Sequence, residues 1–317
     1  MYQAVIQCAM KADKRMLLTA TPYVNNIYDF AGLVNLLHGK NLLGFKFRKN
    51  TVDYAYYLKS KNFTAKNTHL IIKFLKGHVD YIKSCRSGKL FPKVREVFLE
   101  IPMSKSYAKK YNHAEIFYPK AHRFYHGYRK AVNEAGKGYY SEKLDHIIPN
   151  LKGQKSVIYT NWLTHGVKVI EKLLEANGVT YSVFQGSLTK KKRQIMLADF
   201  NANKFQVLII TRAGGEGIDL KGVRNMIILD PVWHDAGLQQ VIGRVVRYKS
   251  HVHLPPNQRN VTIWKLVLVP PSNKKPAITS KLKNYTNPTC DLLLYKIIKR
   301  KNDEQKQVDK ILKACEI

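Results

Sequence analysis

Short apolar runs alternate with amphipathic segments through the middle of the chain. Five segments are rich in branched aliphatic or aromatic residues and have the length of buried strands: residues 156–160, 179–184, 206–211, 225–229 and 260–269. Three segments between them carry apolar side chains at helical spacing: residues 163–177, 189–200 and 239–246. This alternation predicts an α/β fold with a parallel sheet covered by helices on both faces.

The two ends of the chain show other patterns. Residues 15–21 predict one strand before Pro22, and a single strand cannot make a sheet, so we expect its partners to lie upstream of Met1. Residues 28–138 are predicted to be mainly helical, with many aromatic side chains among lysines. Residues 270–276 are a linker by composition, and the tail from Asp291 predicts one or two helices.

The charge of the chain points to a polyanionic partner. The chain has 54 Lys and Arg residues against 22 Asp and Glu residues, which gives a net charge of +32. The excess is largest in residues 1–138, at +17, compared with +9 in residues 139–271 and +6 in residues 272–317. We therefore expect nucleic acid to be a partner.

Cysteine spacing and hydropathy exclude several classes of protein. The four cysteines are far apart and lack metal-ligand spacing, which excludes a disulfide scaffold and a zinc finger and indicates an intracellular protein. No apolar stretch reaches the roughly 20 residues needed to cross a bilayer, and residues 1–10 do not resemble a secretory signal. We expect no membrane partner and no bound structural metal.

Two motifs carry candidate chemistry. Gln240, Gly243, Arg244 and Arg247 form a Q-x-x-G-R-x-x-R pattern, which predicts three polar side chains on one side of a helix. Arginines held in this way bind phosphate oxygens through paired hydrogen bonds. The alternative, a solvated basic helix face, is disfavoured because Gly243 and the neighbouring valines indicate close packing. The second motif, residues 211–220, is a glycine loop that follows a buried strand, where ligands bind in open α/β sheets.

Together these motifs resemble the C-terminal half of superfamily 2 helicases and translocases. The resemblance is greatest to the Swi/Snf-type ATPases and to their relatives in large DNA viruses, such as poxviral nucleoside triphosphatase I. Six segments carry it in the order found in these families: Leu17–Pro22 with Asn25 and Asn26 (motif III), Phe91–Tyr107 (the segment after the bridging helices), Ser156–Trp162 (motif IV), Phe184–Ser187 (motif IVa), Thr211–Leu220 (motif V) and Gln240–Arg247 (motif VI).

The resemblance implies a fold, a division into parts and a role for individual residues. It implies a second RecA-like helicase lobe at residues 139–271, preceded by a remnant of a first lobe at residues 1–27 and a helical basic linking region at residues 28–138, and followed by a helical tail at residues 272–317. The implied catalytic residues, which face ATP, are Arg247, Arg244 and Gln240. The implied nucleotide-binding residues are Gly217 and Asp219, with Asp219 near the ribose.

The resemblance also implies nucleic-acid contacts and a coupling segment. The implied nucleic-acid-binding residues are Asn161, Gly186, Ser187, Thr211 and Arg212, and the implied coupling residues are Thr19 and Thr21. The basic run Lys190–Arg193 adds phosphate contacts or is a solvated helix face, and these alternatives are equally weighted. Trp162 and Trp233 either stack on bases or pack within the protein, and packing is favoured.

The chain also departs from the family pattern. It contains no G-x-x-x-x-G-K-[ST] loop, which cradles phosphates, and no D-E-x-H box, which holds Mg²⁺. We expect ATP and Mg²⁺ to be shared with a first lobe that is absent from these residues, because the chain comes from a truncated, split or fragmentary reading frame. A separate chain that carries the first lobe is a candidate partner. We expect DNA rather than RNA as the track and, if the protein is viral, a location in the host cytoplasm or the virion.

Two other interpretations remain. In the first, the chain is a non-catalytic binding or regulatory module derived from a helicase. In the second, it is a non-functional remnant, an interpretation that the intact motif spacing disfavours.

Overall fold

The computed structural model describes residues 7–19, 22, 27–39, 71–82, 88, 90–114, 125–211, 218–233 and 235–316. The chain divides into two compact units. The sheet unit comprises residues 86–297, and the helical unit comprises residues 1–85 together with residues 298–317.

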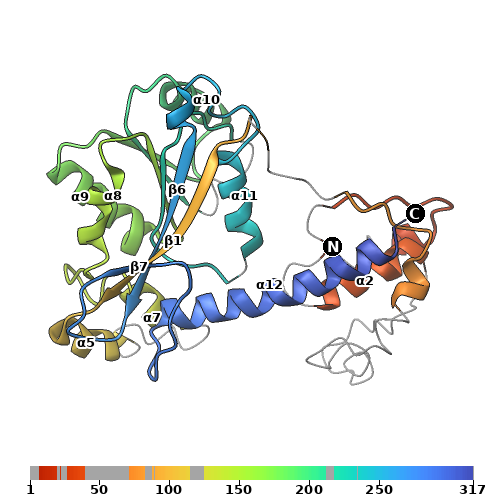
Figure 1. Cartoon of the computed structure of the whole chain (residues 1–317), viewed down its shortest axis with the longest axis horizontal. Helices are drawn as coiled ribbons and strands as arrows, with labels where there is room; N and C mark the ends of the chain where they lie inside the picture. Colours follow the sequence, from red (N-terminus) through yellow and green to blue (C-terminus); the bar gives the residue numbers. More distant parts are fainter. Residues whose placement is uncertain are drawn as a thin grey trace. The chain divides into compact units, whose positions relative to one another are not determined.

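A seven-stranded sheet forms the centre of the sheet unit (Figure 1). Its order is β3-β4-β2-β5-β6-β1-β7, and all neighbouring pairs are parallel except β1 with β7. The strands are β1 (Lys93–Pro102), β2 (Ser156–Thr160), β3 (Tyr181–Phe184), β4 (Val207–Thr211), β5 (Asn225–Ile228), β6 (Asn260–Val269) and β7 (Ala277–Thr279). This arrangement confirms the predicted α/β fold with a RecA-like, mostly parallel sheet.

Helices cover both faces of this sheet. In Figure 1, α8 and α9 lie on one side of the strands and α11 on the other. The helical segments of the unit are α5 (Lys105–Asn112), α7 (His126–Ala131), η2 (Leu144–His146), α8 (Ile147–Leu151), the π-helical η3 (Leu163–Val167), α9 (Lys168–Ala176), α10 (Lys190–Asn201), α11 (Asp235–Val245) and η5 (Pro256–Gln258). Side chains of α8 and α9, among them Ile147, Ile170 and Leu174, pack with Ile158 of β2 in one core cluster. The opposite face of β2 buries Val157 and Tyr159 completely or almost so.

Two strands lie where none was expected. Residues 93–102, placed in the mainly helical region, form β1, which pairs with β6 from Lys93↔Asn260 to Pro102↔Val269. Burial of alternate side chains, Val97, Leu99 and Ile101, gives the physical reason. Residues 277–279 of the expected helical tail form β7, which is antiparallel because the short connection from β6 has no room for a crossover helix. The compact unit thus extends beyond the expected lobe of residues 139–271 in both directions.

The helical unit has a small core of its own. It contains α2 (Ile27–His38), a helical turn at residues 71–75 and the last part of α12 (Cys290–Ala314), which begins in the sheet unit. Val34, Ile71, Leu75, Val308 and Ile311 are buried together. The predicted strand at residues 15–21 is wrong over residues 15–19, which have no regular structure, because they pair with no strand among the described residues. In the described part of the chain, no helix combines the length and apolarity needed to cross a membrane.

Candidate functional site

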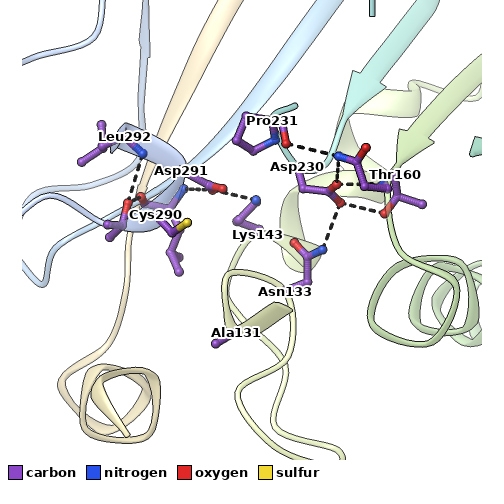
Figure 2. Close-up of polar contacts among 12 residues, drawn as sticks. Ala131, Asn133, Lys143, Thr160, Asp230, Pro231, Cys290, Asp291 and Leu292 are labelled. Carbon is purple, nitrogen blue, oxygen red and sulfur yellow. Dashed lines mark hydrogen bonds and ion pairs between the residues drawn. The ribbon is translucent and has the colours of Figure 1, made fainter. Parts of the chain in front are cut away.

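A buried carboxylate organises the carboxyl ends of the central strands. Asp230 follows β5, is 2% exposed and accepts four hydrogen bonds, as Figure 2 shows in close-up. Its Oδ1 accepts from Thr160 Oγ1 at 2.7 Å and from Asn133 Nδ2 at 3.1 Å. Its Oδ2 accepts from the backbone N–H and the side-chain Nδ2 of Asn161, at 2.8 and 2.6 Å. A carboxylate is buried at low cost only when it is satisfied in this way.

This cluster changes the interpretation of two predicted nucleic-acid contacts. The amide group of Asn161 is occupied within the protein, because Nδ2 donates to Asp230 and to the carbonyl of Pro231, and Oδ1 accepts from the Tyr159 hydroxyl. Thr211, the last residue of β4, is buried next to Thr160, its register partner on β2. The Asn161 side chain is therefore bonded within the protein, and the Thr211 side chain is buried at the end of its strand.

A second buried charge lies beside this cluster. Lys143 Nζ is 2.8 Å from Asp291 Oδ2, and both side chains are almost completely buried. Asp291, at the start of α12, also accepts through Oδ2 from the Leu268 N–H at 3.0 Å. Burial raises the pKa of the Asp291 carboxyl, an effect that the Lys143 ammonium opposes and the Asp230 charge reinforces. No local pattern predicts this pair, because its members are 148 positions apart.

The tryptophans of the two motif regions pack within the protein. The guanidinium of Arg129 on α7 lies over the ring of Trp162, at 5.1 Å from its centroid, and over the ring of Trp233, at 5.4 Å. His126 contacts Trp162 edge to face with the ring centroids 5.9 Å apart. These cation–π and aromatic contacts support the packing alternative for both tryptophans.

Helix α11 presents two of the three predicted catalytic side chains. It buries Leu238, Val241, Ile242 and Val245 on one side, while Gln240 is exposed and Arg244 is partly exposed. The helix ends at Val245, so Arg247 lies two residues beyond it. The expectation that all three polar side chains share one helical face is therefore wrong for Arg247. Its placement depends on the loop that follows the helix.

Arg247 forms an ion pair with the residue predicted to lie near the ribose. Its Nη1 is 3.3 Å from Asp219 Oδ1, and the two side chains are 48% and 54% exposed. Exposed pairs of this kind contribute about 0–1 kcal/mol, so the pair is easily exchanged for another partner. The structure thus brings together residues of motifs V and VI that are separated by 28 positions.

The predicted residues fall into two groups at opposite ends of the strands. Asp219 lies near the amino ends of the strands. The Asn201 side chain donates to the Asp219 carbonyl and accepts from the Lys221 N–H, both at 2.9 Å. Lys155, which directly precedes β2, donates to the Asn201 carbonyl at 3.3 Å. Asn161 and Thr211 lie at the carboxyl ends. The segment with the glycine loop thus follows the carboxyl end of β4, and the chain has returned to the amino ends of the strands by residue 219.

The remaining predicted residues are exposed or lie outside the described part of the chain. Gly186 and Ser187 are exposed, and the Gly186 carbonyl accepts from Arg193 Nη2 at 2.6 Å. Thr189 caps α10, and Lys190, Lys191 and Lys192 are exposed along its first turn. Thr19 is exposed in irregular structure. The predictions for Thr21, Arg212 and Gly217 lie outside the described residues.

Within the described ranges, no three His, Cys, Asp or Glu side chains come together in an arrangement that could hold a metal ion.

Comparison with known proteins identifies the class of this lobe. The helicase conserved C-terminal domain matches residues 140–249, which include Asn161, Asp219 and Arg247. The SNF2-related domain matches residues 1–161, just over half of the chain. The chain therefore belongs to the SNF2-related family and corresponds to the C-terminal half of a superfamily 2 helicase. The expected resemblance to poxviral nucleoside triphosphatase I is not shown by these matches.

Two similar proteins come from Acanthamoeba polyphaga mimivirus, L538 and R563, both provisionally named ATP-dependent RNA helicases. L538 is 29% identical over 297 residues, which cover 86% of this chain and 66% of L538. R563 is 24% identical over 332 residues, which cover 86% of this chain and 58% of R563. The chain thus spans less than two thirds of each relative.

Among solved structures, the E. coli DEAD-box protein SrmB, crystallised with regulator of ribonuclease activity A, matches 40% of this chain and 70% of its own chain. Its sequence identity is 20% and its TM-score is 0.34.

Proposed function

We propose that this chain supplies the second lobe of a nucleic-acid-dependent ATPase and completes an ATP site whose phosphate loop belongs to a first lobe outside these 317 residues. The observation that carries the proposal is the half-exposed Arg247 beside Asp219, two residues beyond a helix whose apolar side is packed into the lobe. The sequence contains no G-x-x-x-x-G-K-[ST] loop of its own, which supports the division of labour.

Arg247 fits the role of an arginine finger in its charge, its exposure and its single long ion pair. A guanidinium held by one long ion pair can transfer to phosphate oxygens when a closing lobe presents them, because the lost pair contributes little. Asp219 then acts as the partner that holds Arg247 extended until the lobes close. Arg244, partly exposed on α11, is the second candidate for contact with a phosphate. Bound ATP supplies the bond that is cleaved, and the chain's arginines stabilise the charge that develops there.

Mg²⁺ is assigned to the first lobe in this proposal. The described residues offer no suitable group of three ligands, and Asp219, the acidic side chain next to Arg247, is paired with it. Among the described residues, the contribution to charge neutralisation in this proposal comes from arginine.

The nucleic-acid track is proposed to contact the exposed start of α10. Gly186, Ser187 and the lysines Lys190, Lys191 and Lys192 are all exposed there, and the net charge of +32 favours binding to phosphates. Asn161 is removed from this set because its amide is bonded internally. The mimivirus relatives carry RNA helicase names, so the proposal specifies a nucleic acid without a preference for DNA.

The test is turnover by the chain reconstituted with a first lobe of an SNF2-related ATPase, fused or as a separate chain. Arg247→Ala should lower kcat by about 10³ to 10⁵ and leave nucleic-acid binding intact, because removal of an arginine finger costs this much. Arg247→Lys should rescue poorly, since an ammonium does not reproduce the planar fork. Lys204→Ala, which removes an ion pair to Asp199 far from motif VI in the sequence, is the matched control and should have no effect.

Near-normal turnover by a folded Arg247→Ala protein would overturn the assignment of motif VI. If the reconstituted wild type bound nucleic acid but hydrolysed no ATP, the chain would be a binding or regulatory module.

A further inference from the structure

The loop that carries Arg247 is tied down by a buried histidine. His251 is 1% exposed, and both of its ring nitrogens are hydrogen-bonded. Its Nε2 lies 2.7 Å from the Val223 carbonyl, and its Nδ1 lies 2.8 Å from Ser250 Oγ. Because a carbonyl only accepts, Nε2 carries the proton. In this neutral tautomer Nδ1 is an acceptor, so the Ser250 hydroxyl donates to it.

Ser250 extends this tie to the backbone of Arg247. Its Oγ accepts from the Arg247 N–H at 3.3 Å. The Arg247 carbonyl oxygen, 2.7 Å from Oγ, competes with His251 Nδ1 for the single hydroxyl proton. The Ser250 carbonyl accepts from the Gly222 N–H at 2.9 Å. Ser250 and His251 therefore connect the loop after α11 to residues 222–223 at two points. Those residues lie just after Asp219, the partner of Arg247.

The hydrogen bonds of α11 do not hold the backbone of Arg247, so its position depends on this connection. The last helical hydrogen bond at the end of α11 runs from the Val246 N–H to the Ile242 carbonyl at 2.7 Å. The Arg247 N–H is therefore not part of the helical hydrogen-bond pattern. Its side chain is half exposed and has a long, weak ion pair. The position of the guanidinium thus depends on where the backbone of residue 247 is held.

We infer that His251 is a positioning residue for Arg247, which through Ser250 fixes the backbone from which the arginine reaches into the ATP site. The inference rests on the proposed function for its catalytic consequence. His251 touches no reacting group. Burial lowers the pKa of His251, an effect that the hydrogen bond to Val223 opposes and that His253, Arg224 and Lys155 reinforce, so the neutral ring with Nε2 protonated is favoured.

The first readout is amide hydrogen exchange of the isolated full chain, which needs no ATPase activity. His251→Phe keeps a ring in the cavity and removes both hydrogen bonds. The amides of Gly222 and Arg247 should then exchange about tenfold faster or more, while amides of β2 such as Ile158 stay unchanged. His253→Phe is the matched control, because it changes an exposed histidine of the same loop.

If His251→Phe accelerates exchange throughout the sheet, the substitution has destabilised the whole fold. Amide exchange in Ser250→Ala then provides the test. That variant removes only a hydroxyl and should accelerate exchange at Arg247. Exchange at Arg247 that matches the wild type in a folded variant would overturn the inference.

The second readout is a double-mutant cycle in the reconstituted enzyme. His251→Phe should lower kcat about 10- to 100-fold with little change in KM, because a misplacement near 1 Å costs this much. His251→Gln, whose amide can still donate to Val223, should recover part of the loss.

In the Arg247→Ala background, His251→Phe should cost nothing further, since the residue it positions is gone. An equal cost in both backgrounds would show a general structural role and would contradict positioning. If Arg247→Ala itself were harmless, the proposed function would fail, while the exchange data would still decide whether His251 ties the loop.

Discussion

Replacement of Asp230 by asparagine tests whether this carboxylate holds the strand ends together. Asp230 accepts two hydrogen bonds at each carboxylate oxygen, and Asp230→Asn turns one of these oxygens into a donor. The less costly orientation points the new amide N–H₂ at Thr160 and Asn133, because the threonine hydroxyl can rotate. Asn133 can also turn its Oδ1, which is buried without a hydrogen-bond partner, toward the new donor.

The expected cost follows from the bonds that change. Two hydrogen bonds to a charged group, each contributing about 1.5–3 kcal/mol, become weaker neutral bonds or are lost. The turned Asn133 would also lose its bond to the His165 carbonyl, now 3.1 Å long. We expect Asp230→Asn to lower the free energy of unfolding by about 3 kcal/mol, mainly through the charge of these bonds.

The assay is urea unfolding of the full chain followed by circular dichroism. Asp199→Asn is the control, because it removes one carboxylate charge from a partly exposed ion pair with Lys204 and should cost less than about 1 kcal/mol. Equal unfolding midpoints for the two variants would refute the role given to Asp230.

Three further predictions concern charge. Lys143→Met should destabilise the chain by about 3–5 kcal/mol, because it leaves Asp291 buried and unpaired. In thermal unfolding, the double variant Lys143→Met/Asp291→Asn should be more stable than Lys143→Met alone. Burial lowers the pKa of Lys155 from 10.5 to about 8, so the unfolded chain binds more protons between these pH values. The stability of the wild type relative to Lys155→Met should therefore rise from pH 8 to 10.5, and an unchanged difference in chemical denaturation would contradict this. Nucleic-acid affinity measured by anisotropy should fall with salt, with a slope near −0.9 per phosphate neutralised on duplex DNA, whereas a flat response would exclude phosphate contacts.

Local sequence patterns predicted the sheet because its central strands are continuous apolar runs. Strand β2 is buried along its whole length, and helix α9 shows a clear apolar side, so both were found close to their observed bounds. Strand β1 was missed because its first residues are charged and exposed and only its second half alternates. Strand β7 was missed because three residues at a sheet edge give no periodic signal.

The candidate site was predictable only as far as motif residues are close in sequence. The pattern in motif VI placed Gln240 and Arg244 on α11, but the end of the helix at Val245 could not be read from it. The partners of Asp230 come from segments up to 97 positions away, and His251 meets Val223 across 28 positions. Such contacts are fixed by the tertiary fold, and a single sequence carries no local signal for them.

The central claim is that this chain forms one wall of an ATP site and another lobe forms the rest. The most direct measurement is ATP turnover, with nucleic acid present, by this chain alone, by a separately produced first lobe alone, and by the two combined. The account predicts negligible turnover from each alone and nucleic-acid-stimulated turnover from the pair, lost in Arg247→Ala. Turnover by this chain alone at the rate of the pair would contradict the account.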